Sequence, residues 1–167
     1  VPFTLSTVGI CPIEEVRAAA TGPFWFQLYM MRDREVVQRL LARAQAGGCR
    51  TLLFTVDLPM AGLRQRDLRN GMIGRDTVRA KLAKAWQLGT RPGWIVDVGL
   101  LGKPHSFGSL TDVVADPTDP HAYKAWIDAQ FDPTVTWKDI EWLRGLWDGK
   151  LYIKGVLEAP RAVGAAA

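Results

Sequence analysis

A chain of 167 residues, 48% hydrophobic and 23% charged, has the composition of a globular domain with a core of its own. It contains no uninterrupted apolar run of the length a membrane-spanning helix needs. The chain begins directly in a strand-like run, so no signal peptide is expected. Cys11 and Cys49 lie outside any metal-ligand spacing, and we expect two reduced thiols and no metal site.

The net charge of +4 is concentrated in one segment. Residues 64–103 carry nine Lys or Arg and three Asp, a net charge of +6, while the rest of the chain carries −2. A local excess of this kind points to an anionic partner for this segment rather than to a generally basic protein.

Short β-prone runs alternate with helical patterns along the chain. The runs are residues 3–7, 24–29, 51–57 and 151–155. Helices are predicted over Pro12–Ala20, over Arg34–Ala46 behind an Asp33 cap, and from Thr136 to a stop at Gly149. Strands that alternate with helices predict an α/β protein with a parallel sheet.

A long insertion, residues 65–135, separates the third strand from the Thr136 helix within one predicted domain, residues 1–167. Within it, residues 75–88 form a predicted basic amphipathic helix, with Val78 and Leu82 on its apolar side. An anionic membrane surface suits such a helix, and a solvated helix packed on its own domain is the alternative. Nucleic-acid binding is not expected, because no recognisable motif accompanies the charge.

Polar side chains follow the apolar strands at the points where those strands end. They are Ser6, Gln27, Tyr29, Thr55, Asp57 and Lys154. Because ligands bind at the carboxyl ends of parallel strands, these side chains are predicted to face one ligand. Ser6 as a turn cap, Gln27 and Tyr29 as half-buried strand residues, and Asp57 as a turn former remain alternatives. Lys154 ends an apolar strand and needs an anion or a partner.

Several motifs together resemble one family. They are residues 4–7, 11–16, 25–29, 32–34, 55–59, 62–67, 137–143 and 153–156. In order and spacing they are similar to the FMN-dependent 2-hydroxy acid oxidase and dehydrogenase family over nearly the whole chain. Residues 94, 97–100, 103–105 and 131–133 are most similar to the bacterial respiratory members that oxidise L-lactate. Members that oxidise mandelate are the alternative.

The resemblance implies a partial TIM (β/α)8 barrel, of which this chain supplies the second to fifth strands. It implies FMN as cofactor, with Ser6, Gln27 and Thr55 on the polar edge of the flavin. Lys154 is implied near the flavin's N1 and O2, where a cation stabilises the charge of the reduced ring. Tyr29 and Arg64 are implied to hold the substrate carboxylate, and Asp57 to orient a histidine base.

The implied reaction is oxidation of L-lactate, or a similar L-2-hydroxy acid, to the 2-keto acid by transfer of a hydride equivalent to FMN. Membrane quinone is the implied electron acceptor. The implied location is peripheral, on the cytoplasmic side of the bacterial inner membrane, and the complete protein is expected to be a homo-oligomer.

Two family segments have no counterpart in residues 1–167. One carries an active-site tyrosine and a flavin-binding strand, and the other carries the histidine base and a second substrate arginine. The chain is therefore expected to be an internal piece of a larger enzyme, inactive alone. The alternative is a noncatalytic half-barrel that binds anions or membrane, or that pairs with a complementary fragment.

Overall fold

The computed structural model describes residues 3–58, 65–66, 77–102, 106–114 and 119–157. The chain divides into two compact units, the first built from residues 1–61 and 105–167 and the second from residues 62–104. The insertion predicted over residues 65–135 covers residues 65–104 of the second unit and residues 105–135 of the first.

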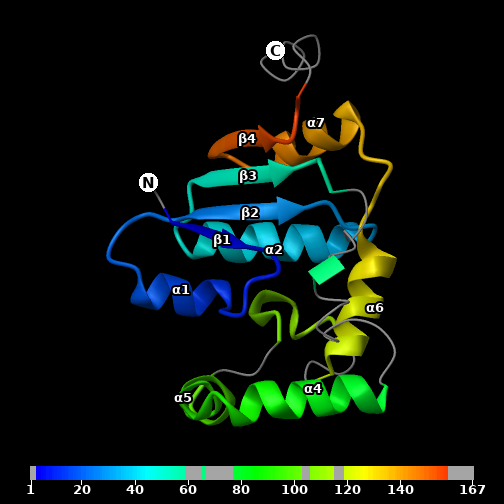
Figure 1. Ribbon diagram of the computed structural model, residues 1–167. Helices are drawn as coiled ribbons and strands as arrows, with labels where there is room; N and C mark the ends of the chain where they lie inside the picture. Colours follow the sequence, from blue (N-terminus) through cyan, green and yellow to red (C-terminus); the bar gives the residue numbers. More distant parts are fainter. Residues whose placement is uncertain (1–2, 59–64, 67–76, 103–105, 115–118, 158–167) are drawn as a thin grey trace. The chain divides into compact units, whose positions relative to one another are not determined.

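The first unit is built on a four-stranded parallel sheet in which consecutive strands are neighbours (Figure 1). The strands are β1 (Thr4–Ser6), β2 (Trp25–Tyr29), β3 (Thr51–Thr55) and β4 (Lys150–Lys154). All three strand pairs are parallel. This order confirms the predicted α/β sheet, and it is the order that strands follow around a (β/α)8 barrel.

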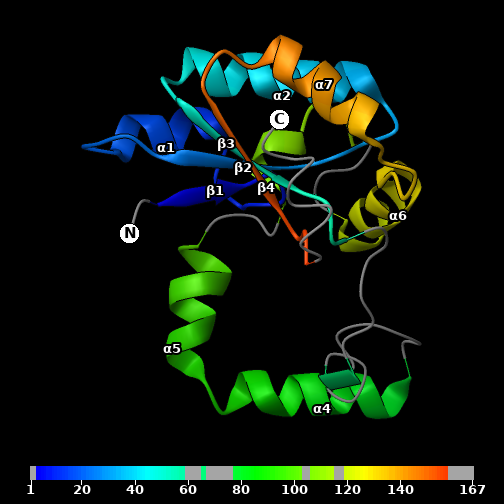
Figure 2. The same ribbon diagram turned by 90° about the horizontal axis from the view of Figure 1, so that it is seen from above.

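Three helices lie on the same side of this sheet (Figure 2). They are α1 (Ile13–Ala19), α2 (Arg34–Ala46) and α7 (Trp137–Leu146). Side chains alternate between the two faces of a strand, and on this face the buried apolar residues of the sheet meet those of the helices. The core includes Phe26, Leu28, Leu52 and Phe54 from the strands, and Val37, Leu40, Leu143 and Trp147 from the helical segments.

Capping residues determine where two of these helices begin. The Asp33 side chain accepts hydrogen bonds from the backbone N–H groups of Glu35 (3.0 Å) and Val36 (3.3 Å), as an N-cap residue does. At the start of α7, the Asp139 carboxylate accepts from the Thr136 N–H (2.8 Å) and hydroxyl (2.9 Å). Both starts agree with those predicted from the sequence.

The end of the insertion returns to the sheet at the carboxyl end of β2. A short 3₁₀ turn, η2 (Gly108–Leu110), and helix α6 (Pro120–Gln130) precede this return. Figure 1 places α6 at the end to which the strands point. The Arg32 N–H donates to the Gln130 carbonyl (2.7 Å), and the Asp132 N–H donates to the Met30 carbonyl (3.3 Å).

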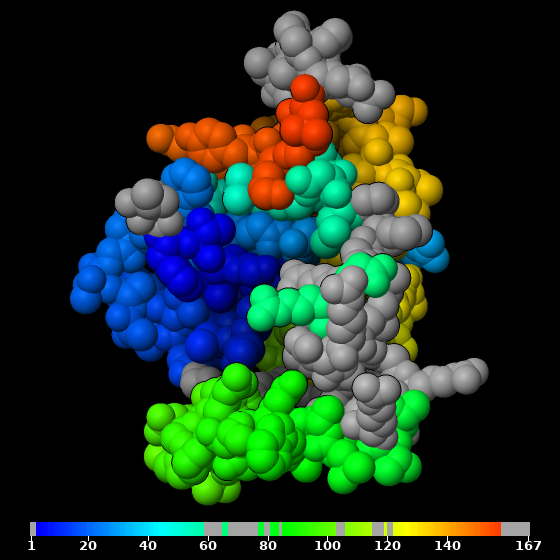
Figure 3. All heavy atoms as spheres, viewed as in Figure 1, coloured from blue at the N-terminus to red at the C-terminus, as the bar shows by residue number. Residues whose placement is uncertain are grey.

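The second unit contains helix α4 (Val78–Gly89), a short α5 (Pro92–Trp94) and the π-helical turn η1 (Ile95–Leu100). Many of its apolar side chains lie at the surface, where Figure 3 shows the green atoms of this segment. Val78, Leu82 and Trp86 recur every fourth residue and so share one face of α4. Within the described residues, no helix has the length and hydropathy needed to cross a bilayer.

Candidate functional site

The polar strand-end residues lie on the face of the sheet opposite α1, α2 and α7. Tyr29, Thr55 and Lys154 are register partners on β2, β3 and β4, and Ser6 is paired with Gln27 across β1 and β2. Residues in register on neighbouring parallel strands point to the same face. The structure therefore brings these five predicted site residues together.

A chain of hydrogen bonds joins three of them. The Ser6 hydroxyl donates to Gln27 Oε1 (2.8 Å), and Gln27 Nε2 donates to Thr55 Oγ1 (3.0 Å). Gln27 and Thr55 are buried, at 7% and 6% exposure. Ser6 also accepts a hydrogen bond from the Val8 N–H at 3.4 Å. It therefore makes the contact expected of a turn cap in addition to its bond to Gln27.

The hydrogen-bond donors and acceptors that these three side chains leave unused suit a ligand with alternating donors and acceptors. The amide group of Gln27 has a second N–H, its oxygen has a second lone pair, and the Thr55 hydroxyl accepts from Gln27 while its own proton remains to donate. The polar edge of a flavin ring presents carbonyl oxygens beside a ring N–H. The donor and acceptor set therefore fits FMN, with these residues at the polar edge and Lys154 supplying a positive charge beside them.

Asp57 and Lys154 form an ion pair that sequence reasoning did not anticipate. Lys154 Nζ lies 3.0 Å from Asp57 Oδ2 and 3.3 Å from Oδ1. Gly155 makes this approach possible: its φ is +103°, and a Cβ there would lie 2.5 Å from Cβ of Asp57. Only glycine combines that backbone conformation with that contact. The glycine after Lys154 was the available signal in the sequence.

Tyr29 and Arg64, the two residues predicted to bind substrate, differ in what the structure describes. Arg64 lies outside the described residues. Tyr29 is half-buried, and its ring packs against Phe131 with centroids 5.2 Å apart. Phe131 follows α6 and is far from Tyr29 in sequence, so no local pattern predicts this contact.

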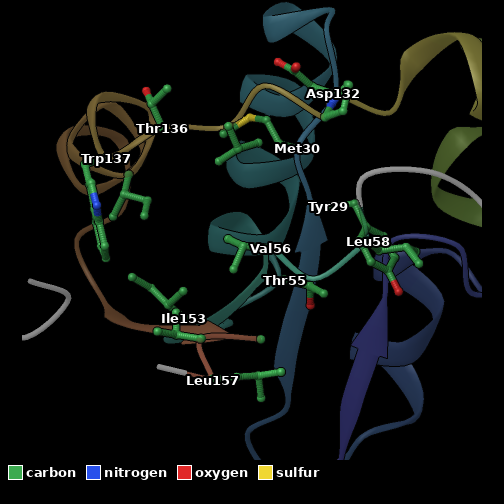
Figure 4. A pocket seen from close by; sticks show the side chains of 15 residues that line it. Tyr29, Met30, Thr55, Val56, Leu58, Asp132, Thr136, Trp137, Ile153 and Leu157 are labelled. Carbon is green, nitrogen blue, oxygen red and sulfur yellow. The ribbon is translucent and has the colours of Figure 1, made fainter. Parts of the chain in front are cut away.

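A pocket of about 590 Å³ lies at the strand ends, and two residues of the predicted site, Tyr29 and Thr55, line it. Figure 4 shows Tyr29 and Thr55 from the sheet on one side and Thr136 and Trp137 from the start of α7 on the other. Most of the remaining lining is apolar, including Met30, Val56, Leu58, Val135, Ile140, Ile153 and Leu157. Its volume is in the range of small-molecule sites.

Asp132 lines this pocket from the connection between α6 and α7. Its carboxylate accepts from the Thr134 hydroxyl (2.6 Å) and N–H (2.9 Å). These hydrogen bonds, with a smaller contribution from the positive charge of Arg34, hold the pKa of Asp132 below its usual value. Asp132 therefore carries a full negative charge near neutral pH.

Thr7, which has no predicted role, supports the site from the residue after Ser6. Thr7 is fully buried, and both its hydroxyl (2.6 Å) and its N–H (2.9 Å) donate to the Gln27 carbonyl. Two bonds to one carbonyl anchor the end of β1 to β2, which fixes Ser6 beside the Gln27 amide. Among the described residues, no group of three His, Cys, Asp or Glu side chains is placed to hold a metal ion.

Curated bacterial enzymes are similar to almost the whole chain. The L-lactate dehydrogenase of Pseudomonas entomophila (strain L48) is 48% identical over 162 residues, which are 97% of this chain and 42% of that protein. The L-lactate dehydrogenase of Vibrio parahaemolyticus serotype O3:K6 (strain RIMD 2210633) is 48% identical over 158 residues, 95% of this chain and 41% of that protein. The chain thus spans about two fifths of the length of these relatives.

A solved structure has the same fold over the same length. The monotopic membrane protein (S)-mandelate dehydrogenase superposes with a TM-score of 0.82 at 30% identity, covering all of this chain and 44% of that one. The resemblance expected from the sequence and the partial-barrel fold are confirmed. The sequence profile described as FMN-dependent dehydrogenase matches residues 1–167, which also confirms FMN as the family's cofactor. The chain belongs to the FMN-dependent dehydrogenase family.

Proposed function

We propose that this chain is the part of an FMN-dependent dehydrogenase that binds the polar edge of the flavin, in a protein that oxidises L-lactate or a similar L-2-hydroxy acid. The observation that carries the proposal is the hydrogen-bonded chain of Ser6, Gln27 and Thr55 on the strand-end face. Its neighbours on that face, Tyr29 and Lys154, supply a hydroxyl and a positive charge.

When bound, FMN supplies the chemistry of a hydride acceptor. With FMN bound, Gln27 and Thr55, which are both buried, would donate to and accept from its polar edge. Lys154 would supply a positive charge near N1 and O2, which stabilises the negative charge of a reduced flavin. Its ion pair with Asp57 keeps the ammonium group in place at the end of β4.

Three further residues are proposed to bind the substrate or to orient the catalytic base. Tyr29 donates a hydrogen bond from its hydroxyl to the carboxylate of the hydroxy acid, and Arg64 binds the same carboxylate with its planar guanidinium group. Asp57 orients the histidine that accepts the proton of the substrate hydroxyl, and it stabilises the cationic form of that histidine.

The second unit supports a proposal about where the complete protein lies in the cell. We place the complete protein on the cytoplasmic side of the bacterial inner membrane as a peripheral, homo-oligomeric protein that passes its electrons to quinone. Support comes from the monotopic membrane relative and from Leu82 and Trp86 on α4, which are 67% and 75% exposed. Exposed apolar faces of this kind insert into the interface of a bilayer.

The test uses the complete protein, purified and loaded with FMN. Anaerobic L-lactate is expected to bleach the visible absorbance of the flavin, and D-lactate is expected to leave it unchanged. Mandelate serves as the competing substrate, and a soluble quinone analogue is expected to restore the absorbance. A protein that binds no flavin, or one whose flavin L-lactate does not reduce, contradicts the proposal. Failure to bind flavin favours the noncatalytic alternative.

A further inference from the structure

The end of α6 is fastened to the chain that leaves β2. Backbone hydrogen bonds join Arg32 to Gln130 and Asp132 to Met30, at 2.7 and 3.3 Å. Between these bonds, Met31 and Phe131 form an antiparallel bridge. Two bonds on either side of one residue fix its backbone in position and direction. Phe131 is therefore held beside the carboxyl end of β2 although about a hundred residues separate the two in sequence.

Arg34 reinforces this junction with its side chain. Its guanidinium group donates to Asp132 Oδ2 (2.9 Å), to Asp139 Oδ1 (2.8 Å) and to the Met31 carbonyl (3.0 Å). It also lies over the ring of Trp142, 5.6 Å from the centroid. One planar cation thus ties the start of α2 to both the α6–α7 connection and α7 itself.

The side chain held by this junction packs on a predicted substrate residue. The Phe131 and Tyr29 rings lie 5.2 Å apart at an interplanar angle of 34°, a favourable aromatic geometry. Phe131 is 6% exposed, so its ring has little freedom to move away. Within the described part of the chain the Tyr29 hydroxyl has no hydrogen-bond partner, which leaves it available to a ligand.

We propose that Phe131 is a positioning residue for Tyr29. Phe131, Arg34 and Asp132 together form what we call the Phe131 clamp. By fixing the Tyr29 ring before substrate arrives, the clamp lowers the entropy cost of aligning its hydroxyl with the substrate carboxylate. This inference rests on the proposed function of Tyr29 and adds a residue to which the family resemblance gives no role.

A purely structural role for Phe131 makes a different prediction. A core residue that only contributes packing lowers stability when it is truncated, and its loss disturbs flavin binding, kcat and KM together. The clamp predicts an effect that is confined to KM for the hydroxy acid and that depends on the Tyr29 ring.

The first experiment measures steady-state kinetics of the complete, FMN-loaded protein with Phe131→Leu. An aromatic pair contributes about 0.5–1.5 kcal/mol, so KM for L-lactate is expected to rise about two- to tenfold. FMN affinity and kcat are expected to change less than about twofold. The matched control is Phe107→Leu, which breaks the Phe107–Tyr123 ring pair at 4.9 Å and is expected to leave KM unchanged.

A second variant loosens the clamp without truncating a buried ring. Arg34 is 34% exposed at its side chain, so Arg34→Lys is expected to keep the charge and the fold. It replaces the planar guanidinium, which bonds Met31 through Nη1 and both Asp132 and Asp139 through Nη2, with a single ammonium nitrogen. A smaller rise in KM of the same kind is expected. This variant gives the answer if Phe131→Leu fails to fold.

Double-mutant kinetics separate positioning from packing. In a Tyr29→Ala background, Phe131→Leu is expected to add no further rise in KM, because the residue through which it acts is gone. An equal rise in both backgrounds, or an unchanged KM in Phe131→Leu and Arg34→Lys, overturns the clamp. The Tyr29→Phe variant tests the underlying assignment separately: an unchanged KM there removes Tyr29 from the substrate site, and the clamp with it.

Discussion

The two units of this chain place the same types of side chain in opposite environments. In the first, Phe26 and Leu52 are completely buried between sheet and helices. In the second, Trp86 on α4 and Leu101 after η1 are 75% and 77% exposed. Apolar residues of the first unit form a buried core, whereas many of those in the second unit lie at its surface.

This difference is informative because apolar composition alone does not distinguish a core from an interface. Scattered exposed apolar residues are ordinary, but a stripe repeated along one helix face marks a surface that another phase or molecule covers. In the first unit, the sheet face opposite the helices instead carries polar side chains at the strand ends, and Ser6, Gln27 and Thr55 among them are joined by hydrogen bonds. This contrast supports the proposal that the first unit binds the ligand and that the second attaches the protein to a membrane.

The largest expected effect comes from truncating one apolar residue in each of the two units. Phe54→Ala removes a fully buried ring and is expected to lower the free energy of unfolding by about 3–5 kcal/mol. Leu82→Ala removes a side chain that is 67% exposed and is expected to change it by less than about 0.5 kcal/mol. Urea denaturation of the complete protein measures both. Similar losses in the two variants contradict the contrast.

Attachment is tested by replacing one exposed aromatic residue. Burying a large apolar side chain is worth about 1.5–3 kcal/mol, so Trp86→Ser is expected to weaken binding to vesicles of anionic lipid at least about tenfold. Trp137→Ser, which alters a tryptophan 42% exposed on α7, is the control and is expected to bind normally. Sedimentation with vesicles gives the answer, and equal binding by Trp86→Ser and the unaltered protein refutes the assignment.

The polar face is tested through the residue at its centre. Gln27→Leu removes both bonds of the Ser6–Gln27–Thr55 chain and leaves the buried Thr55 hydroxyl without its partner, while Ser6 keeps only its contact with the Val8 N–H. A buried polar group without a partner costs about 1–3 kcal/mol, so FMN affinity is expected to fall about five- to a hundredfold. Gln45→Leu, which removes a bond to the Leu146 carbonyl (3.2 Å), is the control. Fluorescence titration with FMN compares them, and equal affinities contradict the role of Gln27.

The last expected effect, which shrinks at acidic pH, concerns the charge of Asp132 in the first unit. The Asp132 side chain is 9% exposed and its pKa is lowered in the folded protein, first by Thr134 and then by Arg34. A lowered folded pKa gives stability that is present above the unfolded pKa and is lost as pH falls through the folded value. Asp132→Asn is therefore expected to cost about 1–3 kcal/mol near pH 7, and less below pH ~4. A pH-independent difference in urea midpoint contradicts this.

Local sequence signals predicted the regular elements of the first unit. Helix α2 has the predicted bounds because its two ends and its apolar stripe are local: Asp33 caps it, and Val37, Leu40 and Leu41 recur on one side. Strand β4 begins one residue earlier than predicted, because Lys150 pairs with Thr51 across the sheet. The charge of Lys150 masked that pairing in the sequence.

The sequence predicted which residues share the strand-end face, but it did not predict which of their side chains contact each other. Parallel strands bring their ends together, so Ser6, Gln27 and Thr55 were placed correctly on one face. The Asp57–Lys154 pair and the Phe131–Tyr29 contact each join residues about a hundred positions apart. No local sequence pattern, such as a hydrophobic periodicity or a helix cap, links residues so far apart. Their contacts become visible only in the folded structure. Arg64 lies outside the described residues, and its role stays a prediction.

The central claim is that the strand-end face of this chain binds the polar edge of FMN. The most direct measurement is a crystal structure of the complete protein with FMN bound. We predict hydrogen-bond distances, below about 3.2 Å, from the Gln27 amide group and the Thr55 hydroxyl to the polar edge of the flavin, with Lys154 Nζ at N1 or O2. A flavin ring that contacts none of these three side chains contradicts the account.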